Sequence, residues 1–142
     1  MKVTRFSRKR DLIIVDARIW SSRHDKWLSL AVDTASSDTV VTPDLVDLLG
    51  YSPRDGEHAT TVRSAIGKEQ GWTLRVKRFS ALGFVVPDYR IHVFDLATGD
   101  DIDGLLGLSY LDQFNYEVRS REGRLLVERA ADGTLPPPPP WG

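Results

Sequence analysis

The chain has 142 residues, of which 41% are hydrophobic and 27% are charged, a composition typical of one soluble globular domain. Its 19 Lys and Arg nearly balance its 20 Asp and Glu, so no overall field attracts nucleic acid or an anionic membrane. The absence of cysteine excludes disulfides, thiolate catalysis and cysteine-ligated zinc. No apolar run approaches the ~20 residues of a membrane span. We therefore expect a cytoplasmic protein without nucleic-acid or membrane partners.

The two ends of the chain differ in composition from its middle. Residues 1–10 carry a local basic cluster and predict a solvated, flexible N-terminus. A single domain is expected over residues 11–131. Residues 132–142 contain five consecutive prolines, which fit neither a helix nor a sheet and predict a disordered tail of polyproline II character. An SH3- or WW-type partner could bind this tail, but an inert tail is the simpler interpretation.

The first half of the chain predicts two strands and a helix. Residues 11–20 and 27–33 are rich in β-branched and apolar residues, with apolar side chains at every second position of the later run. A helix should then begin with Thr42 as its cap and Pro43 at its first position, and Gly50 should end it.

The middle of the chain predicts more strands. Residues 59–79 have the alternation of a long hairpin with one wet face. Residues 81–86 and 89–96 predict two further strands, separated by the pair Pro87–Asp88.

The last part of the domain predicts a second short helix followed by a hairpin. Ser109 is the expected N-cap of this helix and Asp112 its capping-box partner. Residues 115–120 and 123–129 then form two strands around a turn. The pattern as a whole indicates an all-β domain with two short helices.

One buried strand runs directly into Asp33, although burying a charge is costly unless another group compensates it. A turn or cap is the commonest role for an aspartate at a strand end, so this structural interpretation stays open. His24, His58 and His92 each lack a partner at a ligand spacing, and neither a metal nor another cofactor is expected.

The residues around Asp33 carry a resemblance to a known family. The segment VDTASSDTVVTPDLVDLLGY (32–51) resembles the active-site segment of retropepsin-like aspartic proteases. In that family an apolar strand is followed by Asp-Thr-Gly-Ala/Ser, a hydrophobic pair and a proline-led helix; here the tripeptide is Asp-Thr-Ala. About 70 residues later, DGLLGLSYLDQF (103–114) resembles the family's C-terminal element, two hydrophobic residues and a glycine before a short helix. The likeness runs from Leu28 to Val127. It implies a small closed β-barrel of the retropepsin-like acid protease type, with a flap hairpin and two short helices.

The resemblance also implies a chemistry for Asp33. In this family two aspartates share one proton and activate a water that attacks a peptide carbonyl. Two carboxylates at such close range cannot both ionise, so the pair titrates as one unit. This chain has one such motif, since Asp103 fits the structural element instead. The resemblance therefore implies a homodimer in which each subunit contributes Asp33.

Further roles follow from the same resemblance. Thr34 matches the hydroxyl that braces the opposite loop across the twofold axis. Ala35 stands where the family usually has glycine, and alanine is acceptable there if its φ is negative. Leu105, Leu106 and Gly107 match the structural motif packed behind the catalytic loop.

The hairpin of residues 61–73 takes the place of the flap that closes over a bound peptide. Ala65, Ile66 and Gly67 are expected near its tip, where they would contact substrate. The leading hypothesis is a homodimeric aspartic endopeptidase acting on extended peptides, or on proteins. The alternative is a retropepsin-like module that binds a peptide or partner without effective catalysis, with Ala35 as the trace of that loss. An unrelated small β-barrel binding module is a third possibility.

Overall fold

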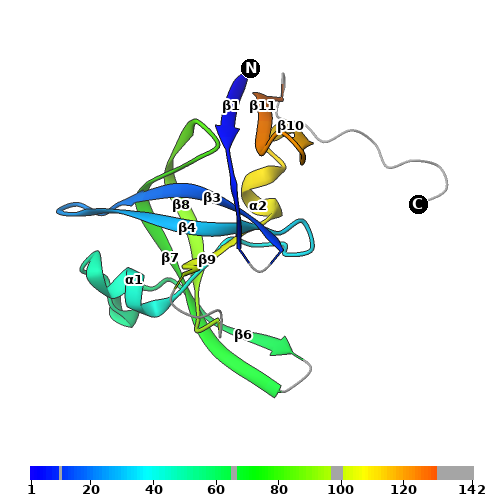
Figure 1. Ribbon diagram of the computed structural model, residues 1–142. Helices are drawn as coiled ribbons and strands as arrows, with labels where there is room; N and C mark the ends of the chain where they lie inside the picture. Colours follow the sequence, from blue (N-terminus) through cyan, green and yellow to red (C-terminus); the bar gives the residue numbers. More distant parts are fainter. Residues whose placement is uncertain (10, 65–66, 97–100, 131–142) are drawn as a thin grey trace.

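Figure 1 shows the computed structural model, which describes residues 1–9, 11–64, 67–96 and 101–130. The helices are α1 (Pro43–Leu48), a 3₁₀ turn (Pro53–Asp55) and α2 (Leu108–Leu111). The strands are β1 (Lys2–Arg5), β2 (Ser7–Lys9), β3 (Leu12–Trp20), β4 (Asp25–Val32), β5 (Val40–Val41), β6 (Ala59–Ser64), β7 (Gly67–Ala81), β8 (Phe84–Val93), β9 (Gly104–Leu106), β10 (Phe114–Arg119) and β11 (Arg124–Arg129).

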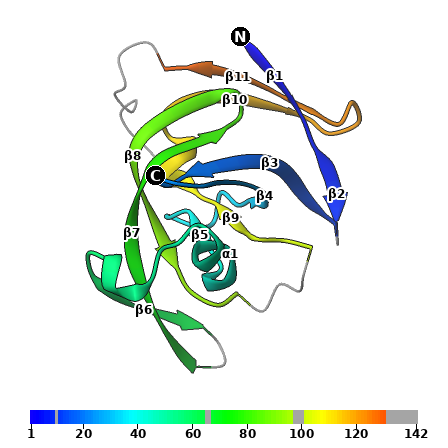
Figure 2. The same cartoon turned by 90° about the vertical axis from the view of Figure 1, so that its left-hand side faces the viewer.

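The strands form a closed barrel, as the resemblance implied. The order β3-β4-β9-β5-β8-β7 returns to its start because β7 also pairs with β3, and closure removes the exposed strand edges of an open sheet. Short β9 is parallel to β4 and antiparallel to β5. A separate three-stranded sheet, β1-β11-β10, and the β6–β7 hairpin project at opposite ends of the barrel in Figures 1 and 2.

The barrel interior follows the period-two alternation of its strands. On β3 the side chains of Val15, Ala17 and Ile19 are buried, and Leu28 and Leu30 face them from β4. These apolar positions lie on one face of each strand because successive side chains point to opposite sides. An aromatic cluster of Phe79, Tyr89, Tyr110 and Phe114 fills one end of the same core.

Tyr110 ties helix α2 to the β7–β8 turn. Its hydroxyl oxygen accepts the Ala81 N–H at 3.2 Å and lies 2.5 Å and 3.0 Å from the carbonyl oxygens of Ala81 and Phe84. The turn needs such support because Leu82 and Gly83 both have positive φ, at 57° and 87°. Burial raises the pKa of Tyr110 well above its usual value, so the hydroxyl keeps its proton.

The prediction for the first helix is confirmed. Thr42 is the N-cap of α1, Pro43 occupies the first turn, and Gly50 follows the C-cap Leu49 with a φ of +89°. Glycine suits that position because side-chain-bearing residues rarely adopt a positive φ.

Two expectations about the strands are wrong. Residues 2–9 form β1 and β2, paired with β11 and β3, rather than a flexible segment. Their backbone can pair because the exposed side of these strands leaves the basic side chains in water. Residues 84–93 form one continuous strand through Pro87. Proline is tolerated there because β8 pairs with β5 only at His92 and Val93, so no strand lies on its other side at Pro87.

The alternation expected over residues 59–79 places Thr73 on the wet face with Arg75 and Lys77, but Thr73 is buried. The segment before β6 covers it, with the Glu57 N–H donating to the Thr73 carbonyl and the Thr73 N–H donating to His58, both at 2.8 Å. The polyproline II prediction concerns residues 132–142, which lie outside the described residues.

We predict that Tyr110→Phe lowers the free energy of unfolding by about 1–3 kcal/mol, because it leaves buried backbone groups of the β7–β8 turn unpaired. Urea denaturation measures the loss. Tyr116→Phe is the matched control: Tyr116 is only partly buried and its hydroxyl has no hydrogen bond in the described structure, so the change should stay within about 0.5 kcal/mol. Equal midpoints for both variants would contradict the role given to Tyr110.

Candidate active site

Asp33 lies where the chain leaves β4 and the barrel. Its backbone N–H donates to the Leu106 carbonyl at 3.0 Å, which extends the β4–β9 pairing beyond Val32. The residue is half-buried. The strand therefore holds the main chain of Asp33 rigidly while its carboxylate stays accessible.

The loop after Asp33 folds back on its carboxylate. The Ala35 N–H donates to Asp33 Oδ1 at 2.9 Å, and the Ser36 N–H donates to the Asp33 carbonyl at 3.2 Å. This is an Asx turn, in which a side-chain oxygen replaces a backbone acceptor. Ala35 is absent from the described non-glycine residues with positive φ, so alanine meets the condition set for it. Thr34 and Ala35 are both exposed.

The same loop caps helix α2 with its carbonyl groups. The Leu108 N–H donates to Ser36 and the Ser109 N–H donates to Ser37, at 2.8 Å and 2.9 Å. The first N–H groups of a helix have no partner within the helix, and a capping side chain usually accepts from them. The predicted cap is therefore wrong: Gly107 is the N-cap and Asp112 the C-cap. Backbone carbonyls from the distant loop take the place of a capping side chain.

Close backbone approach explains the glycines of the second motif. A Cβ on Gly107 would lie 2.2 Å from the Asp38 carbonyl oxygen, and one on Gly104 would lie 1.9 Å from that of Val40. Gly107 has a φ of −103°, so its requirement is space and not backbone freedom. Leu106 is fully buried behind the loop, and Leu105 is half-buried.

A hydroxyl network that the sequence did not reveal lies beneath the loop and joins the buried residues Thr39 and Tyr89 to the exposed Ser109. Thr39 Oγ1 is 3.0 Å from the Tyr89 hydroxyl and accepts the Gly107 N–H at 3.3 Å. The Tyr89 hydroxyl is 2.9 Å from Ser109 Oγ, which accepts the Thr39 N–H at 3.3 Å. Burial raises the pKa of Tyr89, against the opposing effect of its hydrogen bonds to Ser109 and Thr39. The residues share no local motif, since tertiary folding brings them together.

Asp38 closes the loop from the side of β8. Its carbonyl accepts the Ser36 hydroxyl at 2.7 Å, and its Oδ1 lies 3.4 Å from His92 Nε2. One of the three apparently isolated histidines thus has an acidic neighbour, which pairs with it when the imidazole is protonated.

The predicted flap segment forms the β6–β7 hairpin, which pairs from Ala59 with Trp72 to Ser64 with Gly67 and extends away from the barrel (Figure 2). Gly67 is the first residue of β7. Ala65 and Ile66 lie outside the described residues.

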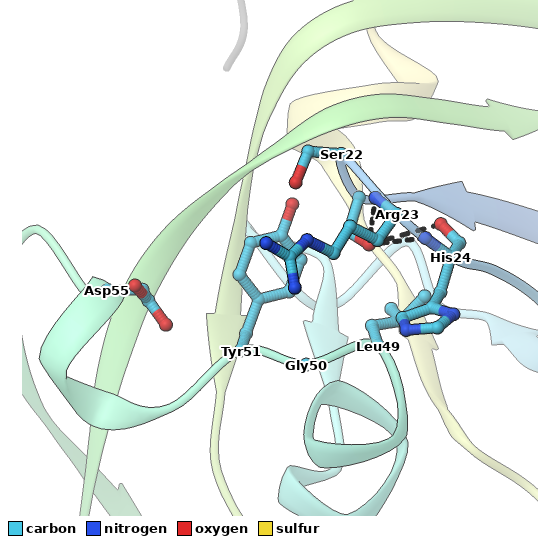
Figure 3. Close-up of a pocket in the computed structure, with 8 residues that line it drawn as sticks. Ser22, Arg23, His24, Leu49, Gly50, Tyr51 and Asp55 are labelled. Atoms are coloured by element: carbon cyan, nitrogen blue, oxygen red, sulfur yellow. Dashed lines mark hydrogen bonds between the residues drawn. The ribbon is translucent and has the colours of Figure 1, made fainter.

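A hollow of about 380 Å³ lies elsewhere on the surface (Figure 3), and neither Asp33 nor its loop lines it. Its lining comes from the β3–β4 turn, the end of α1 and the segment that follows: Ser21, Ser22, Arg23, His24, Leu49, Gly50, Tyr51 and Asp55. Over the described ranges, no three acidic or histidine side chains gather as a metal would require. Nor does this part of the chain contain a helix long and apolar enough to cross a membrane.

A closed barrel with an aspartate loop braced by a Leu-Leu-Gly strand defines a retropepsin-like fold. The aspartyl protease family model matches residues 16–110, and the chain belongs to this family. No curated protein sequence matches the chain.

Solved structures agree on the fold. A retropepsin-like aspartic protease from Rickettsia conorii is 20% identical with a TM-score of 0.65, covering 90% of this chain and 99% of its own. The EIAV protease in complex with the inhibitor HBY-793 is 18% identical, with a TM-score of 0.54 and coverage of 72% and 86%. The retroviral protease-like domain of Ddi1 from Leishmania major is 14% identical, with a TM-score of 0.56 and coverage of 82% and 88%.

We predict that Gly107→Ala lowers the free energy of unfolding by about 3 kcal/mol or more, because the new methyl group meets two backbone carbonyls that cannot move separately. Gly50→Ala is the control. It has open space, with its nearest neighbour 4.0 Å away, but a positive φ, and should cost about 1–2 kcal/mol. Urea denaturation of both variants measures the difference. If the Gly107 variant were as stable as the Gly50 variant, the loop backbone would be able to move away from the new methyl group at little cost, and the prediction would be wrong.

Proposed function

We propose that the protein is a homodimeric aspartic endopeptidase that hydrolyses extended peptides. Water would be activated at a dyad formed by Asp33 from each of two subunits. The single observation that carries this proposal is the hydrogen bonding of the Asp33 carboxylate. Its Oδ1 accepts one backbone N–H, whereas its Oδ2 has no partner among the described residues. A half-buried carboxylate held this way has an acceptor oxygen left for a reacting group.

Asp33 is the aspartate of the chain's single Asp-Thr-Ala motif. The other aspartate considered at the sequence level, Asp103, is engaged in structure. Its Oδ2 accepts the Ser29 N–H at 2.7 Å, and its own N–H donates to the Ser29 carbonyl at 2.8 Å. The second member of a dyad must therefore come from another copy of the chain. A twofold axis beside the loop would bring two Asp33 residues together.

The proposed reaction follows from two carboxylates sharing one proton. The ionised carboxylate removes a proton from water, and the resulting hydroxide oxygen bonds to the peptide carbonyl carbon. The protonated carboxyl donates to the carbonyl oxygen, where negative charge develops. The carboxyl that took the proton from water passes it to the amine nitrogen as the carbon–nitrogen bond breaks. A hydroxyl proton of the tetrahedral intermediate returns to the other carboxylate as the new carboxylic acid forms, so the pair again holds one proton. No bond to the enzyme forms in this sequence, so no other nucleophile is required.

The remaining roles are consistent with this geometry. Thr34 presents an exposed side chain beside Asp33, where a partner loop could receive its hydroxyl. The β6–β7 hairpin would cover an extended substrate, with Ala65, Ile66 and Gly67 at its tip contacting the peptide. Leu105, Leu106 and Gly107 would keep the catalytic loop in place from behind.

Ala35 was the residue that favoured an inactive binding module. Ala35 is not one of the described non-glycine residues with a positive φ, and its N–H donates a hydrogen bond to Asp33 Oδ1. Its methyl group is thus no obstacle to this loop conformation, and no observation favours the inactive alternative. That alternative remains testable because it predicts peptide binding that survives Asp33→Ala, without turnover at any pH.

We predict that Asp33→Asn lowers peptide cleavage by at least about 100-fold, since it removes the general base. The measurement is cleavage of a diverse library of unstructured peptides from acidic to neutral pH, with products identified by mass spectrometry. Asp44→Asn, an exposed change in the first turn of α1, is the matched control and should keep wild-type activity. Undiminished cleavage by the Asp33 variant would exclude the aspartic mechanism.

A second prediction concerns the shared site. Specific activity should rise with protein concentration, because the dyad needs two chains. Adding Asp33→Asn protein should inhibit the wild type by forming mixed dimers that have only one normal aspartate. Sedimentation and activity measured over the same concentration range check this. Full activity from a strictly monomeric chain, unaffected by the variant, would contradict the shared dyad.

A further inference from the structure

An exposed aromatic and cationic surface lies on the outside of the barrel, separate from Asp33. The strand registers place Trp27, Arg18, Ser80 and Val85 in one row across β4, β3, β7 and β8. They place Asp25, Trp20, Arg78 and Pro87 in the adjacent row. We call these two rows the Trp–Arg face. Figure 1 shows β3 and β4 side by side along this part of the barrel.

The tryptophan and arginine side chains of the Trp–Arg face already stack on one another without a bound ligand. The Arg18 guanidinium lies 4.8 Å from the Trp20 ring centre and 5.1 Å from that of Trp27. The Arg78 guanidinium lies 4.9 Å from Trp20 on the neighbouring strand. Arg18 also donates to Asp25 Oδ2 at 2.8 Å. Cation–π contacts of this kind hold flat groups in a fixed arrangement, so little side-chain entropy is left to lose on binding.

This arrangement leaves large apolar groups in water. Trp27 is 64% exposed and Val85 is 50% exposed, although both lie within a regular sheet. Indole rings beside planar guanidinium groups form the type of surface that binds proline-rich segments. Such segments already have an extended polyproline II shape, and their rings pack on aromatic faces.

The chain itself contains a segment of this chemistry. Residues 135–141 read LPPPPPW, in a part of the chain that lies outside the described residues. The described chain ends near the start of β8, one of the four strands that carry the Trp–Arg face. The Arg129 guanidinium lies 5.4 Å from the Phe84 ring centre, and Phe84 points to the opposite side of β8 from its neighbour Val85. The Ala130 N–H donates to the Gln113 carbonyl at 3.2 Å, which fixes this end of the chain.

The segment is long enough to cross the face. In polyproline II form, residues 131–142 would span about 37 Å at ~3.1 Å per residue. The distance from β8 to β4 is three strand spacings, or about 14 Å. We propose that the proline-rich segment 135–141 docks on the Trp–Arg face of its own chain, with its proline rings packed against Trp27 and Trp20. The docked segment covers the indole that the sheet leaves exposed.

Because the chain has no cysteine, Gly142→Cys in the full chain accepts a single nitroxide label at its end. The test compares amide NMR intensities with the nitroxide oxidised and reduced. We expect selective loss of intensity on the Trp–Arg face, at Arg18, Trp27 and Val85, and little loss on α1. Loss of similar size on α1, or no loss on the face, would overturn the proposal.

Two variants of the labelled chain, one with Trp27→Ala and one with all five prolines replaced, distinguish docking from random collision. Trp27→Ala should abolish the selective loss, and serine at positions 136–140 should do the same. Leu48→Ala is the matched control, since Leu48 is also a large exposed apolar residue, at 62%, but lies on α1. It should leave the loss unchanged. Persistence of the loss in the Trp27 variant would show that the segment does not bind this face.

A mixed sample identifies the chain that supplies the segment. Isotope-labelled protein without nitroxide is combined with nitroxide-labelled protein of natural isotope abundance. Same-chain docking predicts that the selective loss is absent from this mixture. A loss in the mixture as strong as that in the singly labelled chain would overturn same-chain docking and assign the segment to a second copy.

Discussion

The candidate site depends on one backbone contact, the pairing of the loop after Asp33 with the segment that runs from β9 into α2. The Asp33 N–H donates to Leu106, and the carbonyls of Ser36 and Ser37 accept the first N–H groups of α2. Each partner satisfies polar groups that would otherwise be buried without a hydrogen bond. Because Gly107 has no side chain, the two segments approach closely enough for all of these bonds to form at once.

The core of the barrel supports this contact from below. The buried residues Thr39 and Tyr89 form a hydroxyl network with Ser109, and Tyr110 extends from α2 to the turn between β7 and β8. Helix α2 is only one turn long and would be marginal alone. It is stable here because its first donors, its serine and its tyrosine all have partners elsewhere in the fold. The loop that holds Asp33 is therefore held in place by hydrogen bonds to this end of the barrel.

Much of this architecture was predictable from local pattern. Apolar residues at every second position indicated β4 and β7, and a run rich in β-branched and apolar residues indicated β3. A proline-led stripe ending in Gly50 indicated α1. These signals depend on near neighbours in the chain. Asp33 and Gly107 were found through their motifs. Pro87 was misleading, because proline signals a break only where its missing N–H would have had a partner. Strand β1 was missed because its pairing partner, β11, lies more than a hundred positions away. Strand β2 was missed although it pairs with the neighbouring β3.

The sequence by itself determined that the chain is a mainly β domain, with an aspartate at the end of a buried strand and a glycine-containing motif far along the chain. Those features depend on residue type and short spacing. Only the tertiary structure decided that the barrel closes through β3 and β7, that the loop carbonyls cap α2, and that Thr39, Tyr89 and Ser109 meet. These contacts join residues that are distant in the chain. Their energies come from closing large loops around a common core, which no local pattern records.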